Sequence, residues 1–174
     1  MDMTKKLYLI ILVMVCCIGC DQMSKNIASN NLKFSEPIVF LGNLFRLQYA
    51  ENTGAFLSLG SDLPASVRTF FFTFLSGGLL VGLFLYIFIN RSFSQKHVLA
   101  LSLILGGGCS NLIDRVANDG RVVDFMNLGI GSLRTGIFNM ADVAIMVGMA
   151  MILLFSIGDR NKTHSEAEST EPPK

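Results

Sequence analysis

Charge is scarce in this chain. Only 16% of its 174 residues are charged, whereas soluble domains contain about 25%, and the formal net charge is +1. The near-even balance excludes a strongly basic nucleic-acid binder, and the 51% hydrophobic content excludes disorder over the body of the chain. The length permits one domain. A small membrane protein or an unusually apolar soluble one remains, and the distribution of the charges distinguishes the two.

Metal-binding motifs are missing as well. Cys17 and Cys20 form a CxxC pair, but no second cysteine pair exists, and the two histidines stand far away at positions 97 and 164. Zinc sites need four such ligands at short spacings, so neither a metal nor a cofactor is expected.

Long stretches of the chain contain no charge or almost none. An α-helix rises 1.5 Å per residue, so about 20 residues cross a hydrocarbon core of about 30 Å. Residues 69–90 and 137–158 reach this length directly, and two shorter runs reach it if charged residues sit at the helix ends. We predict an all-α membrane fold with four transmembrane helices, at residues 7–25, 67–90, 97–116 and 137–158.

Basic residues in the short loops predict the orientation of these helices. Lysine and arginine precede the first helix, separate the second from the third and follow the fourth, which places both termini in the cytoplasm. Segment 26–66 then lies outside, and its Phe, Val, Ile and Tyr residues with Pro and Gly breaks predict a small β-rich cradle on the outer surface. Residues 1–158 form one membrane domain, residues 116–136 form an outer loop, and the polar tail 159–174 is expected to be disordered.

The start of the chain also resembles a lipoprotein signal. Two lysines, an apolar run and then Ile18-Gly19-Cys20 would place a cleavage before Cys20. Because the rest of the chain crosses the membrane repeatedly, a retained first helix is the preferred interpretation, with its cysteines acting as small apolar residues.

Polar residues gather at the predicted outer ends of the helices. Ionisable groups inside or bordering membrane helices are costly and usually functional, and chance does not favour one face so consistently. They are Asp21 and Lys25 after the first apolar run, Asn111, Asp114 and Arg115 at the end of the third helix, Asp124 in the outer loop, and Asn139 and Asp142 at the start of the fourth.

Each of these groups has a purely structural alternative. Asp21 and Lys25 stand at i and i+4, the spacing of an ordinary helix salt bridge. Asn139 followed by Asp142 fits a helix capping box. Arg115 can neutralise the nearby Asp114 or extend to the membrane interface.

A catalytic pairing of Asp124 and Asp142 is the stronger chemical hypothesis. The two residues are 18 positions apart, so a short connection can bring them together. Two carboxylates near an apolar interface cannot both ionise cheaply, so one keeps its proton while the other acts as base. Such a pair activates water for attack on an amide. No serine on the outer side has a histidine partner there, so the sequence offers no better nucleophile.

Five sequence blocks, in order from the first helix to the fourth, resemble those of lipoprotein signal peptidase (signal peptidase II), a family of bacterial membrane aspartyl proteases. They are Asp21-Gln22-Met23-Ser24-Lys25, Asn52-Thr53-Gly54-Ala55-Phe56, Gly106-Gly107-Gly108 with Asn111-Leu112-Ile113-Asp114-Arg115, Val122-Val123-Asp124-Phe125, and Phe138-Asn139-Met140-Ala141-Asp142.

The resemblance implies an activity and residue roles. Asp124 and Asp142 would be the catalytic dyad of an inner-membrane enzyme that cuts diacylglyceryl-modified prolipoproteins before the lipobox cysteine. The substrate site would be lined by Asn52, Gly54, Asn111, Arg115 and Asn139, and supported by Asp21, Lys25 and Asp114. Prolipoproteins and membrane lipids are the expected partners of a monomer, with no nucleic acid. A non-enzymatic lipoprotein binder is the alternative, whereas a transporter would need polar groups at mid-bilayer.

Overall fold

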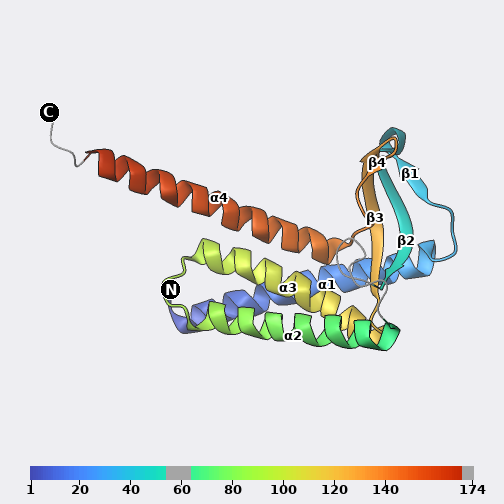
Figure 1. Cartoon of the computed structure of the whole chain (residues 1–174), viewed down its shortest axis with the longest axis horizontal. Helices are drawn as coiled ribbons and strands as arrows, with labels where there is room; N and C mark the ends of the chain where they lie inside the picture. Colours follow the sequence, from blue (N-terminus) through green and yellow to red (C-terminus); the bar gives the residue numbers. More distant parts are fainter. Residues whose placement is uncertain (54–63, 170–174) are drawn as a thin grey trace.

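Four long helices and one small antiparallel sheet make up the described part of the protein (Figure 1). The structure, a computed structural model, describes residues 1–53 and 64–169. Its helices are α1 (Met3–Leu32), α2 (Ala65–Ile89), α3 (Gln95–Ala117) and α4 (Met140–Ser169). Its strands are β1 (Ile38–Phe40), β2 (Phe45–Asn52), β3 (Val122–Ile130) and β4 (Leu133–Arg134), with the short 3-10 helix η1 (Leu41–Asn43) after β1.

Each helix contains a stretch long and apolar enough to cross a membrane. The stretches are Met3–Leu32, Thr69–Ile89, Gln95–Ala117 and Met140–Gly158. The prediction of four transmembrane helices is thereby confirmed, and the chain is a multi-pass membrane protein.

The end of α1 differs from the prediction. The helix continues to Leu32 instead of ending near Lys25, because Ala28 and Leu32 in its last turns pack against Phe125 of the sheet. Asp21 and Lys25 therefore lie inside the helix rather than at its end.

Both ends of α4 also differ from the prediction. The helix begins at Met140 rather than 137, because Phe138 still pairs with β3: its amide donates to the carbonyl of Met126 over 2.8 Å. At the other end, α4 continues as a helix to Ser169, into the tail 159–174 that we predicted to be disordered. Extending an existing helix needs no new nucleus, so even polar residues can prolong it. Residues 170–174 lie outside the described part of the chain.

The central helix is α3, which packs against each of the other three helices. Two glycines permit the close approach. A Cβ at Gly106 would lie 2.9 Å from the Cβ of Cys17 on α1, and a Cβ at Gly107 would collide with the carbonyl oxygen of Ala141 in the first turn of α4. Helices α1, α3 and α4 therefore bring their polar residues within reach of one another.

The sheet has the strand order β1-β2-β3-β4, and every neighbouring pair is antiparallel. Half of its strands come from 116–136, which we predicted to be a loop, so the cradle is not confined to 26–66. Glu51 binds Arg121, just before β3, at 2.7 Å, and it ties the sheet to the end of α1 by binding Lys33, the residue after α1, at 2.9 Å. These bonds and one from Tyr49 lower the pKa of Glu51 to about 2.

The N-terminus and the last described turn of α4 lie at the end of the helices that is remote from the sheet (Figure 1). At this end Lys6 of α1 donates to the carbonyl of Asn90, just after α2, over 2.6 Å. Apolar residues fill the space between the helices here, with Ile10, Ile87, Val98 and Leu105 fully buried. The buried ion pairs of Lys25 with Asp21 and Asp114 lie toward the opposite end, beside the sheet.

Candidate active site

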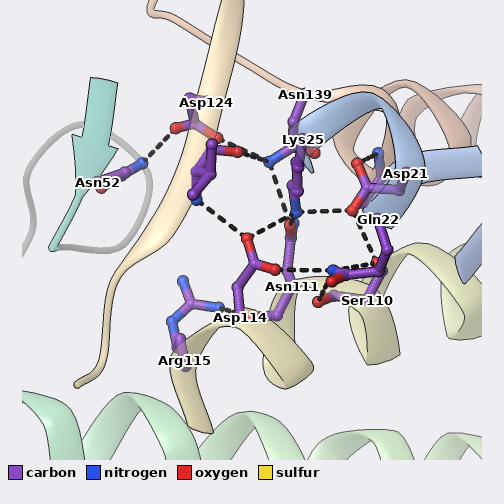
Figure 2. Close-up of polar contacts among 12 residues, drawn as sticks. Asp21, Gln22, Lys25, Asn52, Ser110, Asn111, Asp114, Arg115, Asp124 and Asn139 are labelled. Atoms are coloured by element: carbon purple, nitrogen blue, oxygen red, sulfur yellow. Dashed lines mark hydrogen bonds and ion pairs between the residues drawn. The ribbon is translucent and has the colours of Figure 1, made fainter. Parts of the chain in front are cut away.

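A continuous hydrogen-bond network joins α1, α3 and α4 to the sheet (Figure 2). Its members include eight of the ten residues singled out in the sequence: Asp21, Lys25, Asn52, Asn111, Asp114, Asp124, Asn139 and Asp142. Arg115 borders the network, and Gly54 lies outside the described residues.

Asp142 is fixed by a reciprocal cap at the start of α4. The side chain of Asn139 accepts from the amide of Asp142 over 2.9 Å, and the carboxylate of Asp142 accepts from the amide of Asn139 over 3.1 Å. The capping box that we considered as a structural role for Asn139 and Asp142 is therefore present. The cap also aims the carboxylate at α3, where Asn111 donates to it over 2.9 Å.

Asp124 projects from β3 into the same cluster and is only 3% exposed. Asn52 donates to one of its carboxylate oxygens over 3.1 Å and Asn139 to the other over 2.7 Å. Burial and then the negative charge of Asp142 raise the pKa of Asp124, the bonds from Asn52 and Asn139 oppose the rise, and the net result is a pKa of about 6. The two carboxylates thus interact electrostatically and share Asn139 as a hydrogen-bonding partner.

A buried lysine connects the supporting residues. The ammonium of Lys25 lies 2.6 Å from Asp21 and 3.0 Å from Asp114, and it donates to the side chain of Asn111 over 2.9 Å. All three charged side chains are at least 96% buried, so the ion pairs form away from water. The salt-bridge alternative for Asp21 and Lys25 is correct, but the bridge also extends across to α3.

The two supporting aspartates hold the backbone next to the two candidate catalytic aspartates. Asp21 accepts from the amide of Ala141 over 2.8 Å, and Asp114 accepts from the amide of Val123 over 3.0 Å. Each amide belongs to the residue directly before Asp142 or Asp124. Lys25, which pairs with both supporting aspartates, therefore links the positions of the two carboxylates.

Sequence reasoning missed two members of the network. Ser110 donates to Asp21 over 2.7 Å, and Gln22 donates to Asp114 over 2.7 Å and to the Ser110 hydroxyl over 3.1 Å. Gln22 was visible within the first sequence block, but its role depends on a contact between α1 and α3. Ser110 is one of the outer serines that have no histidine partner, and its hydroxyl instead orients Asp21.

Arg115 contributes mainly charge to this site. Its guanidinium donates to the carbonyl of Asn111 over 3.5 Å, a long bond, while its charge interacts with those of Asp124, Asp142 and Asp114. It can stabilise negative charge that develops near the two carboxylates. Within the described residues, no group of three or more His, Cys, Asp or Glu side chains is placed to hold a metal ion.

The arrangement has the features of an acid–base pair. One carboxyl group has a pKa near neutrality, a second carboxylate is within electrostatic range, and amide groups orient both. Such a pair can take a proton from water and give one to a substrate carbonyl.

Known proteins resemble this chain over most of its length. The family model described as signal peptidase (SPase) II matches residues 13–158. The lipoprotein signal peptidase of Borreliella afzelii is 33% identical over 91% of this chain and 95% of its own length. The lipoprotein signal peptidase of Hydrogenovibrio crunogenus is 34% identical over 87% of this chain and 86% of its own length.

Two solved structures, each described as a bacterial membrane enzyme, share the fold. One gives a TM-score of 0.75 at 24% identity and covers 95% of this chain and 94% of the other. The second structure gives a TM-score of 0.74 at 25% identity and covers 86% of this chain and 93% of the other.

Proposed function

Because the chain belongs to the signal peptidase II family, we propose that it removes signal peptides from diacylglyceryl-modified prolipoproteins, cutting just before the lipobox cysteine. The related proteins of Borreliella afzelii and Hydrogenovibrio crunogenus carry the name lipoprotein signal peptidase, which supports this substrate class.

The reaction is an aspartyl hydrolysis carried by Asp124 and Asp142. The pair shares one proton, and the raised pKa of Asp124 makes this residue its main holder. Ionised Asp142 takes a proton from water as the water oxygen attacks the scissile carbonyl, and Asp124 protonates the carbonyl oxygen. The tetrahedral intermediate then collapses: Asp142 gives the proton it took from water to the leaving amine as the C–N bond breaks, and Asp124 takes a proton back from a hydroxyl of the intermediate. The observation that carries this proposal is the shared partner Asn139, which binds both aspartates.

The remaining polar groups position the substrate and the dyad. Arg115 faces the developing negative charge, and Asn52 covers Asp124 from β2. Asn111 connects Asp142 to Lys25. Gly54 lies outside the described residues and remains a proposed part of the substrate site.

The protein acts in the bacterial inner membrane as a monomer. Both termini are cytoplasmic, in agreement with the basic loops, so the sheet and the dyad lie at the outer face. A signal helix in the bilayer would bring its modified cysteine to this level.

The test is a cleavage assay with purified enzyme in detergent or vesicles. A precursor carrying diacylglyceryl on its lipobox cysteine should be cut, and mass spectrometry should find that cysteine at the new amino terminus. The same precursor without the lipid should remain intact. Equal cleavage of both precursors, or a cut elsewhere, would refute the proposed substrate class.

A further inference from the structure

The free tip of the sheet presents an apolar surface that the candidate active site does not use. We define the sheet tip as Leu41–Leu44 between β1 and β2 together with Ile130–Leu133, which runs from the last residue of β3 to the first residue of β4. Three of its aliphatic side chains are almost fully exposed: Leu41 at 79%, Ile130 at 78% and Leu133 at 83%. Large apolar side chains grouped in this way mark an interaction surface.

The two halves of the sheet tip are held together as one unit. The amide of Gly129 donates to the carbonyl of Leu44 over 2.9 Å, and the guanidinium of Arg134 donates to the carbonyl of Asn43 over 2.8 Å. Side chains from chain segments far apart in sequence therefore form one surface.

The orientation of the sheet brings this surface beside the bilayer. The strands run roughly at right angles to the helices and extend sideways from one end of the bundle (Figure 1). When the helices cross a bilayer, strands in this direction lie along its surface, and the sheet tip is displaced laterally from the helices.

Two neighbouring arginines lie beside the exposed aliphatic residues. Arg134 binds the side chain of Asn127, and Arg46 donates to the side chain of Asn43 over 2.5 Å; both acceptors are neutral. In the described part of the chain neither arginine forms an ion pair with a carboxylate. Burial and then the charge of Arg46 lower the pKa of Arg134. An anion beside this arginine pair would relieve the repulsion.

We propose that the sheet tip docks on the bilayer, with Leu41, Ile130 and Leu133 entering the interface and Arg46 and Arg134 binding the phosphates of anionic phospholipids. Interfacial elements bury their apolar side chains about 5–10 Å into the headgroup region and keep basic groups among the headgroups. Anionic lipid attracts basic residues at the surface by about 1 kcal/mol each, which favours a lipid over a neutral protein partner.

The absence of tryptophan from the chain permits a direct test. Leu133→Trp places a single fluorophore at the sheet tip, and Phe34→Trp is the matched control, because Phe34 is 96% exposed just beyond α1. The full-length variants are reconstituted in vesicles of phosphatidylcholine with phosphatidylglycerol. Leu133→Trp should emit at shorter wavelength than the control and lose intensity with brominated lipids, whereas Phe34→Trp should do neither. Emission from Leu133→Trp that brominated lipids do not quench would overturn the docking. This holds even if the emission is blue-shifted, because contact with a second copy or another protein can also shift it.

The role of the arginine pair is tested by lipid charge. The quenching of Leu133→Trp should be weaker in pure phosphatidylcholine and should lose its dependence on phosphatidylglycerol when Arg46→Gln is added. Equal quenching in both lipids would refute binding of anionic headgroups. A response of the detergent-solubilised protein to inorganic phosphate, with no response to phosphatidylglycerol, would assign the arginines to a free anion instead. These readouts do not depend on peptidase activity.

Discussion

At the scale of single residues, Asn139 has the most consequential contacts. Its side-chain amide donates to Asp124 while its side-chain oxygen caps the amide of Asp142. One asparagine thus fulfils the structural role of a helix cap and orients both candidate catalytic groups. The two interpretations of the sequence pattern at 139–142 are therefore compatible rather than exclusive.

The pKa of Asp124 predicts the pH dependence of the free enzyme. A pKa of about 6 means that the shared proton leaves as the pH rises through this value, so kcat/KM should fall on the alkaline side of about 6. Asn52→Ala removes a bond that favours the ionised form, and the falling limb should move to higher pH. Profiles of kcat/KM against pH for both proteins measure this, and a limb that stays in place or moves to lower pH would contradict it.

The buried position of Lys25 predicts a large effect on stability. Lys25→Met leaves Asp21 and Asp114 as buried charges without their cation, which should cost about 3–5 kcal/mol of unfolding free energy. Lys33→Met is the matched control, because this lysine is 42% exposed and its ion pair with Glu51 lies in contact with water. Its loss should cost far less than the loss of Lys25, because water screens exposed ion pairs. Denaturation of both variants in detergent tests the difference, and equal losses would show that the Lys25 bridge adds no special support.

At the scale of helices and strands, the contact between α3 and α4 sets the position of the dyad. Gly107→Ala would press a methyl group into the carbonyl of Ala141 and displace the first turn of α4, which carries Asp142. We expect activity to fall at least about tenfold, since small displacements of reacting groups have effects of this size. Gly78→Ala is the control, because a Cβ there meets nothing within 4 Å. Full activity in Gly107→Ala would mean that α4 tolerates the shift.

The sequence predicted the elements whose formation depends on local composition. The charge-free runs located all four membrane helices, because length and hydropathy suffice in a bilayer. The last turns of α1 were missed because they depend on the contact between Leu32 and Phe125, which are remote in sequence. Strand β3 was missed although Val122-Val123 favours a strand, because its pairing with β2 joins distant segments.

The site was predictable in part for the same reason. Spacing and the family blocks identified the residues at 124 and 142 together with their neighbours, since all of them carry distinctive polar chemistry. The contacts of Gln22 and Ser110 could not be predicted, because they exist only where α1 crosses α3.

At the scale of the whole molecule, the scarcity of charge acquires a spatial meaning. The end of the bundle near the termini is filled with apolar residues, while the opposite end concentrates the ion pairs and amides beside the sheet. The proposed orientation predicts that reporter domains fused to the N-terminus and to the C-terminus both report the cytoplasm. A periplasmic signal from either fusion would invert the proposed orientation of the site.

The most direct test of the aspartyl dyad is single-turnover cleavage of a diacylglyceryl-modified precursor by the wild-type protein, Asp124→Asn and Asp142→Asn. Both substitutions keep the size of the side chain, and both proteins should remain folded in the membrane. Each should lose at least about a hundredfold in rate, because acid–base groups contribute about 10²–10⁴. Cleavage at the wild-type rate by either variant would contradict the dyad.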